Sequence, residues 1–152
     1  MKIAEALNLR ADAQRKLSEL SQRLEKNAQV QEGEKPAENP NKLLAEYEIV
    51  LEELNVLVKR INRTNNTVEL EPGLTLMEAI TDRDHIASRR NALANLKQSA
   101  TQQQDRYSRT EIKFVSTVDV VAIQKQVDAL SKEYRTFDSR IQQMNWQADL
   151  IE

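Results

Sequence analysis

Apolar residues recur at alternating spacings of three and four along most of this chain, and that repeat predicts long α-helices. The longest unbroken run is Ile123, Val127, Leu130, Tyr134, Phe137, Ile141, Met144, Ala148 and Ile151. This spacing keeps one stripe of a helix facing a partner helix, as in coiled coils. Only 2 Gly and 3 Pro occur in 152 residues, so the sequence offers few points at which a helix must end.

Signals for helix ends divide the repeat into four helices. Asn39 before Pro40 predicts one N-terminus, Thr75 with Glu78 forms a capping box, and Thr117 is expected to cap the last helix. The helices are expected at about residues 2–30, 40–64, 76–103 and 118–151. Short β-strands are expected in the connections, because residues 67–70 and 111–115 alternate polar and apolar side chains.

The second helix carries two apolar stripes. The first is Leu43, Tyr47, Val50, Leu54, Leu57 and Ile61, and the second is Leu44, Leu51 and Val58. Such a wide apolar face predicts two neighbouring helices and the deepest burial of the four. The stripe of the first helix is Ile3, Ala6, Arg10, Ala13, Leu17, Leu20 and Leu24, and the third helix has the weakest stripe because Arg83 and Arg90 interrupt it.

The fold that follows is a single all-α domain over residues 1–152. Its four long amphipathic helices form either an up-down bundle or paired helical hairpins, with coiled-coil-like seams. In an up-down bundle, the starts of the first and third helices meet the ends of the second and fourth. That topology would bring together Glu5, Asn62, Arg63, Asn65 and Asn145, beside Trp146. We expect these residues to form a hydrogen-bonded plug at the helix ends.

Composition bounds the partners and the compartment. The net charge of −2 predicts no bulk attraction to nucleic acid or to an anionic membrane, so neither is expected as a partner. Acids dominate from Glu32 to Glu53 and bases from Arg83 to Lys113, which indicates helix faces that complement each other or a weak anion-binding surface. A soluble, cytoplasmic protein is expected, because the chain lacks a signal peptide, an apolar run of about 20 residues and any cysteine.

The residues offer little for catalysis. Glu78, Asp82 and His85 share a helix face, but a carboxylate–histidine metal site in a bundle needs such a face on two helices, and His85 is the only histidine. A solvated helix face is favoured, and no metal is expected. Two glycines are too few for a phosphate-binding loop. We therefore expect no enzyme, no catalytic residues and no cofactor.

Two polar clusters are candidate ligand sites. Asn62, Arg63 and Asn65 lie at the end of the second helix, where capping of the helix is the alternative role. The other cluster is Arg106, Tyr107, Arg109 and Lys113. Arginine beside tyrosine can hold a phosphate or a carboxylate, whereas a loop held by ion pairs is the alternative. A small anionic ligand is thus one expected partner, and we expect the Arg–Tyr loop to face a groove.

Six short segments, spread over nearly the whole chain, form an ordered set. They are residues 2–7, 61–65, 106–113, 118–120, 124–128 and 145–146, with the sequences KIAEAL, INRTN, RYSRTEIK, VDV, QKQVD and NW. Together they resemble the septicolysin-like family of small bacterial proteins. The resemblance implies a bacterial, cytosolic, helical protein, and the family name implies a cytolysin. It implies no catalytic or binding residue for this chain.

The function favoured by the sequence is a structural or interaction module that self-associates into a homo-oligomer through its helix seams. A small-ligand or anion-binding protein that uses the loop Arg106–Lys113 is the first alternative. A membrane-active, cytolysin-like protein is the second, although the apolar stripes are already committed to helix seams.

Overall fold

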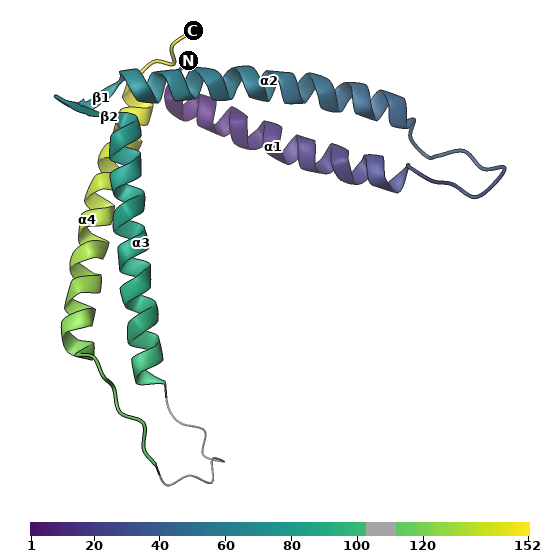
Figure 1. The fold of residues 1–152 in the computed structure, drawn as a ribbon. Coiled ribbons are helices and arrows are strands. Elements are labelled where there is room, and N and C mark those ends of the chain that lie inside the picture. The colour runs from purple at the N-terminus through teal and green to yellow at the C-terminus, as the bar shows by residue number, and fades with distance from the viewer. Residues whose placement is uncertain (103–111) are drawn as a thin grey trace. The chain divides into compact units, whose positions relative to one another are not determined.

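The computed structural model describes residues 1–102 and 112–152 (Figure 1). Within these residues it has four helices and one small antiparallel sheet of two strands. The elements are α1 (Ile3–Lys26), α2 (Pro40–Thr67), β1 (Glu69–Glu71), β2 (Leu74–Thr75), α3 (Leu76–Thr101) and α4 (Val120–Gln147). The expected all-α fold with short strands in a connection is confirmed.

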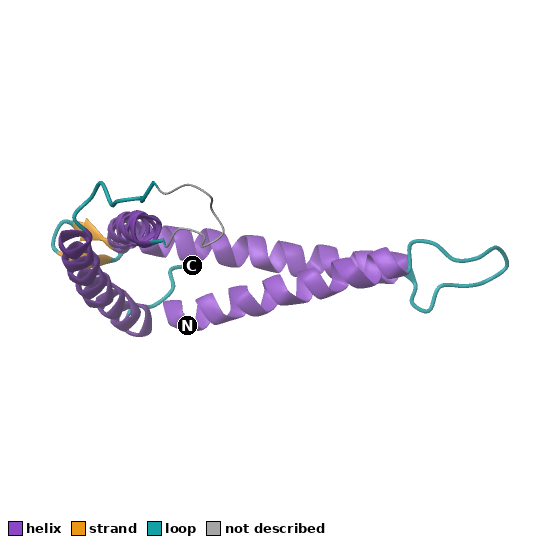
Figure 2. Ribbon diagram, turned by 90° about the horizontal axis from the view of Figure 1, so that it is seen from below, coloured by secondary structure: helices purple, strands orange, loops and turns teal. Residues whose placement is uncertain are grey.

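The chain divides into two compact units, and each contains one helical hairpin. The first unit is Met1–Thr75 together with Gln142–Glu152, and it holds the antiparallel pair α1 and α2. The second unit is Leu76–Ile141, and it holds α3 with most of α4. Paired helical hairpins were one of the two expected arrangements. Figure 2 shows α1 and α2 side by side, joined by a long loop.

Two apolar clusters lie in the core of the first unit. One is formed by Leu17, Leu20, Leu43 and Val50, with Ala13, Leu24, Tyr47 and Leu54 packed against it. The other is formed by Ala6, Ile61 and Leu150, with Leu7 and Leu57 beside it. Both clusters use the expected stripes of α1 and α2. Leu150 shows that the C-terminal segment is part of this core.

The second apolar stripe of α2 is not covered. Leu44 and Leu51 are 46% and 45% exposed, although both are large apolar side chains. The prediction that α2 packs against two neighbouring helices is therefore wrong among the described residues of its own unit. One helix neighbour, α1, covers a single stripe, and the flanks of α2 stay in contact with solvent.

Local capping explains where α2 begins and ends. The Asn39 side chain accepts a hydrogen bond from the Asn41 amide at 2.9 Å, as predicted. The helix continues three residues beyond the predicted end at Thr64, because the Val68 amide still donates to the Thr64 carbonyl at 2.8 Å. Asn62, Arg63 and Asn65 thus lie inside the last turns of α2, and the capping role proposed for them is wrong.

The other boundaries differ from the predicted ones for similar local reasons. Helix α1 ends at Lys26, where the Asn27 amide donates to the carbonyl oxygens of Arg23 and Leu24, each at 3.2 Å. Helix α4 begins after Asp119, whose side chain accepts from the Ala122 amide at 3.0 Å, so Asp119 takes the capping role predicted for Thr117.

The expected strand near residue 67 is present as a hairpin. β1 pairs with β2, and Gly73 takes a φ of 82° in the turn between them, a conformation that glycine adopts without strain. The second expected strand is absent from its described part, residues 112–115. Glu111 lies outside the described residues.

Polar pairs accommodate the arginines that interrupt the stripe of α3. Arg83 donates to Asp138 of α4 at 2.9 Å and also pairs with Asp84. The Arg90 guanidinium lies 4.9 Å from the ring centroid of Tyr134, which is cation–π distance. The second hairpin therefore has buried leucine and isoleucine side chains together with a charged pair and a cation–π contact.

Candidate functional site

A groove of about 650 Å³ lies along the first hairpin, and its walls come from α1 and α2 alone. Its lining residues are Leu9, Ala13, Ile49, Glu52, Glu53, Leu54, Val56, Leu57 and Arg60. Six of these nine side chains are apolar, and the volume is within the range of ordinary ligand sites. No feature of the sequence alone pointed to this groove.

The α1 side of the groove is formed by Leu9 and Ala13. Ala13 is small, so it leaves room beside the larger apolar side chains of α2. Arg10 does not line the groove, but it occupies the stripe position between Ala6 of one apolar cluster and Ala13, which packs against the other. The Nε atom of Arg10 is buried and has no hydrogen-bond partner among the described residues. The interruption at Arg10 was visible in the sequence, but its consequence for packing was not.

Three apolar side chains at the groove are about half exposed. The exposed fractions are 47% for Leu9, 61% for Ile49 and 48% for Val56. Ile49 and Val56 are seven residues apart, so they lie on the same face of α2. Apolar surface of this kind on one face of a helix commonly marks an interaction site.

Charge changes sign along α2. Glu46, Glu48, Glu52 and Glu53 precede Val56, whereas Lys59, Arg60 and Arg63 follow it. Of these, Glu52, Glu53 and Arg60 line the groove. The Nε atom of Arg60 donates to the Ile151 carbonyl oxygen at 3.1 Å, which holds this side chain in place. The groove is therefore acidic toward the start of α2 and basic toward its end.

The predicted polar cluster at the end of α2 holds the C-terminal segment. The Thr64 hydroxyl accepts from the Ile151 amide at 3.0 Å and donates to the Arg60 carbonyl at 2.7 Å. Arg63 donates to the Glu152 carbonyl oxygen. Asn62 is exposed, whereas Asn65 is buried and its Oδ1 atom has no partner among the described residues.

The N-terminus joins the same place. The Leu150 amide donates to the Met1 carbonyl at 2.8 Å, and the Ile3 amide donates to the Ala148 carbonyl at 3.2 Å. Lys2 pairs with Asp149 at 2.8 Å, and hydrogen bonding from Lys2 lowers the pKa of that carboxyl. Figure 1 shows both termini beside the end of α2.

The side chains that bond to backbone groups in this terminal cluster are those of Lys2, Arg60, Arg63 and Thr64. The hydrogen-bonded plug that was expected from the asparagines stays a prediction. Asn145 is buried as a plug residue would be, and Trp146 beside it is exposed. Hydrogen bonds join the start of α1, the end of α2 and the residues after α4. An up-down topology also predicts that these three segments lie together. What this cluster can do chemically is fix the helix ends.

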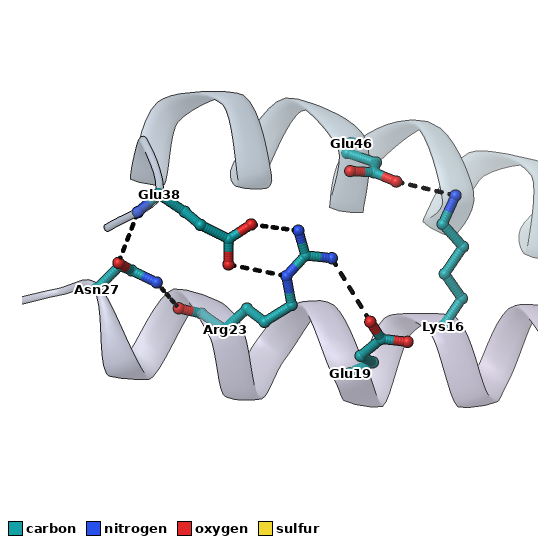
Figure 3. Close-up of polar contacts among 6 residues, drawn as sticks. All are labelled: Lys16, Glu19, Arg23, Asn27, Glu38 and Glu46. Atoms are coloured by element: carbon teal, nitrogen blue, oxygen red, sulfur yellow. Dashed lines mark hydrogen bonds and ion pairs between the residues drawn. The ribbon is translucent and has the colours of Figure 1, made fainter. Parts of the chain in front are cut away.

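A second polar cluster closes the other end of the first hairpin (Figure 3). Arg23 donates to both carboxylate oxygens of Glu38, with an Nε–Oε2 distance of 3.0 Å, and lies 3.6 Å from Glu19. Asn27 donates to the Arg23 carbonyl at 2.8 Å and accepts from the Glu38 amide at 2.9 Å. Hydrogen bonding from Arg23 lowers the pKa of Glu38.

Arg23 and its partners hold the loop between α1 and α2, and Lys16 adds a further link between the helices through Glu46 at 2.9 Å. Every charge drawn in Figure 3 has a partner within the cluster, so the arrangement is structural. Sequence reasoning missed it, because three acids between residues 32 and 38 are equally good candidates for pairing with Arg23.

The predicted Arg–Tyr loop falls mostly outside the described residues. Arg106, Tyr107 and Arg109 are not described, so their expected groove is not tested. Lys113 is described and exposed, as are the apolar side chains of Phe114 and Val115 beside it. The two predicted ligand clusters therefore stay predictions.

Two further findings concern metals and membranes. Residues 1–102 and 112–152 contain no group of three or more histidine or acidic side chains that could hold a metal ion. None of the helices in this part of the chain is both long and apolar enough to cross a membrane.

Comparison with known proteins identifies a family but no activity. A crystal structure of a functionally unknown conserved protein from Corynebacterium diphtheriae is similar at 48% identity, with a TM-score of 0.93 and 99% of each chain covered. A search of curated proteins finds no match. The resemblance to septicolysin-like proteins stays a prediction. A family of unknown function, DUF6847, matches residues 10–150, and the chain belongs to this family.

Proposed function

We propose that this protein is a structural or interaction module that self-associates through its first helical hairpin. The observation that carries the proposal is the apolar groove with Leu9, Ile49 and Val56 about half exposed along it. A hairpin of two helices has one internal seam, so a second surface of this size needs a partner to leave water.

Covering the apolar side chains at the groove supplies part of the free energy that association requires. Complete burial of a leucine, isoleucine or valine is worth about 1.5–3 kcal/mol. Covering the exposed half of three such side chains would contribute roughly 2–4 kcal/mol per copy on that scale. Two copies together would offset much of the association cost of about 4–15 kcal/mol.

The two rival functions have less support from the described residues. Glu52 and Glu53 at the groove disfavour a small anion there, because like charges repel. The anion-binding alternative depends on Arg106, Tyr107 and Arg109, and a thermal-shift screen with phosphorylated metabolites tests it. Leakage from liposomes tests the membrane-active alternative. The location we propose is the cytoplasm, which suits a chain without cysteine.

Light scattering coupled to size exclusion tests the proposal directly. We expect a mass that is a multiple of the 17.5 kDa chain mass at micromolar concentration. Association of folded copies would also make the thermal midpoint rise with protein concentration. A mass of one chain across this range would refute self-association.

A further inference from the structure

The order of charges along α2 makes its groove face complementary to itself. From Glu46 onward, acidic side chains precede Val56 and basic side chains follow it, and both kinds reach the groove through Glu52, Glu53 and Arg60. A helix face with this order repels a parallel copy, because acids then meet acids. It attracts an antiparallel copy, because the acidic half of each helix meets the basic half of the other.

We propose that a second copy of this chain docks in the groove, with α2 packed antiparallel on α2 about a two-fold axis at Val56. The proposal rests on the proposed self-association and names its surface and geometry. In a two-fold interface each contact occurs twice. Glu52 is four residues before Val56 and Arg60 is four residues after it, so each copy places Glu52 opposite Arg60 of the other.

Apolar contacts fill the centre of this interface. Val56 meets Val56 of the second copy on the axis, and Ile49 and Leu9 lie at the groove on either side. The exposed surfaces of these apolar side chains supply the affinity, whereas the charged pairs set the direction and register of the two helices. A shift of one helical turn would place an acid or Arg60 against Val56 and lose both sets of contacts.

The opposite flank of α2 is the natural rival surface. It exposes Leu44 and Leu51 to a similar extent, but its polar neighbours are Glu48 and Asn55, which provide no acid–base order. The groove lies on the Val56 side and includes none of these four residues. The complementarity of charge and shape therefore favours the Val56 face.

Two matched substitutions distinguish the faces. Val56→Asp places two carboxylates near the axis and should weaken dimerisation at least about a hundredfold, the scale of losing a central contact residue. Leu51→Asp is the control, since Leu51 is on the same helix with 45% exposure against 48% for Val56. We expect the control to remain a dimer. If Leu51→Asp weakens the dimer and Val56→Asp does not, the proposed face is wrong, although self-association still holds.

Charge reversal tests direction. Arg60→Glu alone, or Glu52→Arg with Glu53→Arg, should each weaken the dimer about tenfold by placing like charges opposite each other. The three changes together in one chain restore opposite charges only if the helices are antiparallel. If the triple variant dimerises more weakly than both Arg60→Glu and the double variant, the antiparallel arrangement is excluded.

Cysteine crosslinking reads the register at a chosen position, because the natural chain has no cysteine and the introduced thiols alone can form a disulfide. Val56→Cys should form a disulfide-linked dimer under native conditions. Glu52→Cys alone should not, since two copies of position 52 would lie roughly 12 Å apart along antiparallel helices, beyond disulfide reach. Glu52→Cys combined with Arg60→Cys should crosslink. Efficient crosslinking by Glu52→Cys alone would contradict the register, and a monomeric wild-type protein would refute self-association itself.

Discussion

Arg10 occupies a place in the α1–α2 seam that a leucine would fill better, and Arg10→Leu is expected to stabilise the protein. Arg10 stands at a stripe position between the two apolar clusters of the first unit. Its Nε atom is buried without a partner among the described residues. A leucine there would continue the stripe from Ala6 toward Leu17 and place apolar surface against α2.

The gain can be bounded from these contacts. An unsatisfied buried donor costs about 1–3 kcal/mol, and the substitution removes it. The aliphatic stem of Arg10 already covers part of the seam, so leucine adds less than its full burial energy. A net gain of about 1–2 kcal/mol remains, which corresponds to a rise of roughly 2–8 °C in Tm for a chain of this size.

Thermal denaturation followed by circular dichroism measures the effect, with both proteins at the same concentration so that association does not bias the comparison. Arg15→Leu is the control, because Arg15 is exposed on the same helix and pairs with the exposed Asp12. The control should stay within about 0.5 kcal/mol of wild type. A lower Tm for Arg10→Leu would show that the guanidinium stabilises the seam and would refute this reasoning.

Four other substitutions test the described contacts. Leu20→Ala should lower the unfolding free energy by about 2–5 kcal/mol, since Leu20 is fully buried, whereas Leu44→Ala on the open flank should cost less than about 1 kcal/mol; urea denaturation compares them. Hydrogen bonding from Arg23 lowers the pKa of Glu38 from 4.5, so this pair stabilises the fold above that pH and the contribution is lost as pH falls below it. Glu38→Gln should reduce that pH dependence in melts at acidic pH, and an unchanged acid profile would contradict the pairing. Thr64→Val leaves the Ile151 amide without its acceptor and should cost about 1–3 kcal/mol, with faster hydrogen exchange at that amide.

Much of the helical architecture could be predicted, because helix formation depends on neighbouring residues. The spacing of apolar residues located all four helices, and Asn39 before Pro40 predicted the start of α2 from local hydrogen bonding alone. The positive φ of Gly73 in the turn between β1 and β2 is likewise a local property, because glycine adopts it without strain. These features need no knowledge of distant residues.

The candidate site could not be predicted in this way. The groove depends on how Leu9 and Ala13 of α1 meet α2, which is a property of two segments packed together. The partner of Arg23 was equally ambiguous, because nearby acids are alike in sequence and only the path of the loop brings Glu38 within reach.

The end of α4 shows most clearly which features the sequence determines and which depend on tertiary structure. The apolar repeat continues through Ala148 to Ile151 and predicts helix there, yet α4 ends at Gln147. Backbone groups of residues 148–152 bond instead to Met1, Ile3 and Thr64. They also accept hydrogen bonds from the side chains of Arg60 and Arg63, near the end of α2. The sequence alone determined which segments have the periodicity of a helix. Tertiary structure decided where this helix stops, because distant donors and acceptors satisfy the same backbone groups that another helical turn would use.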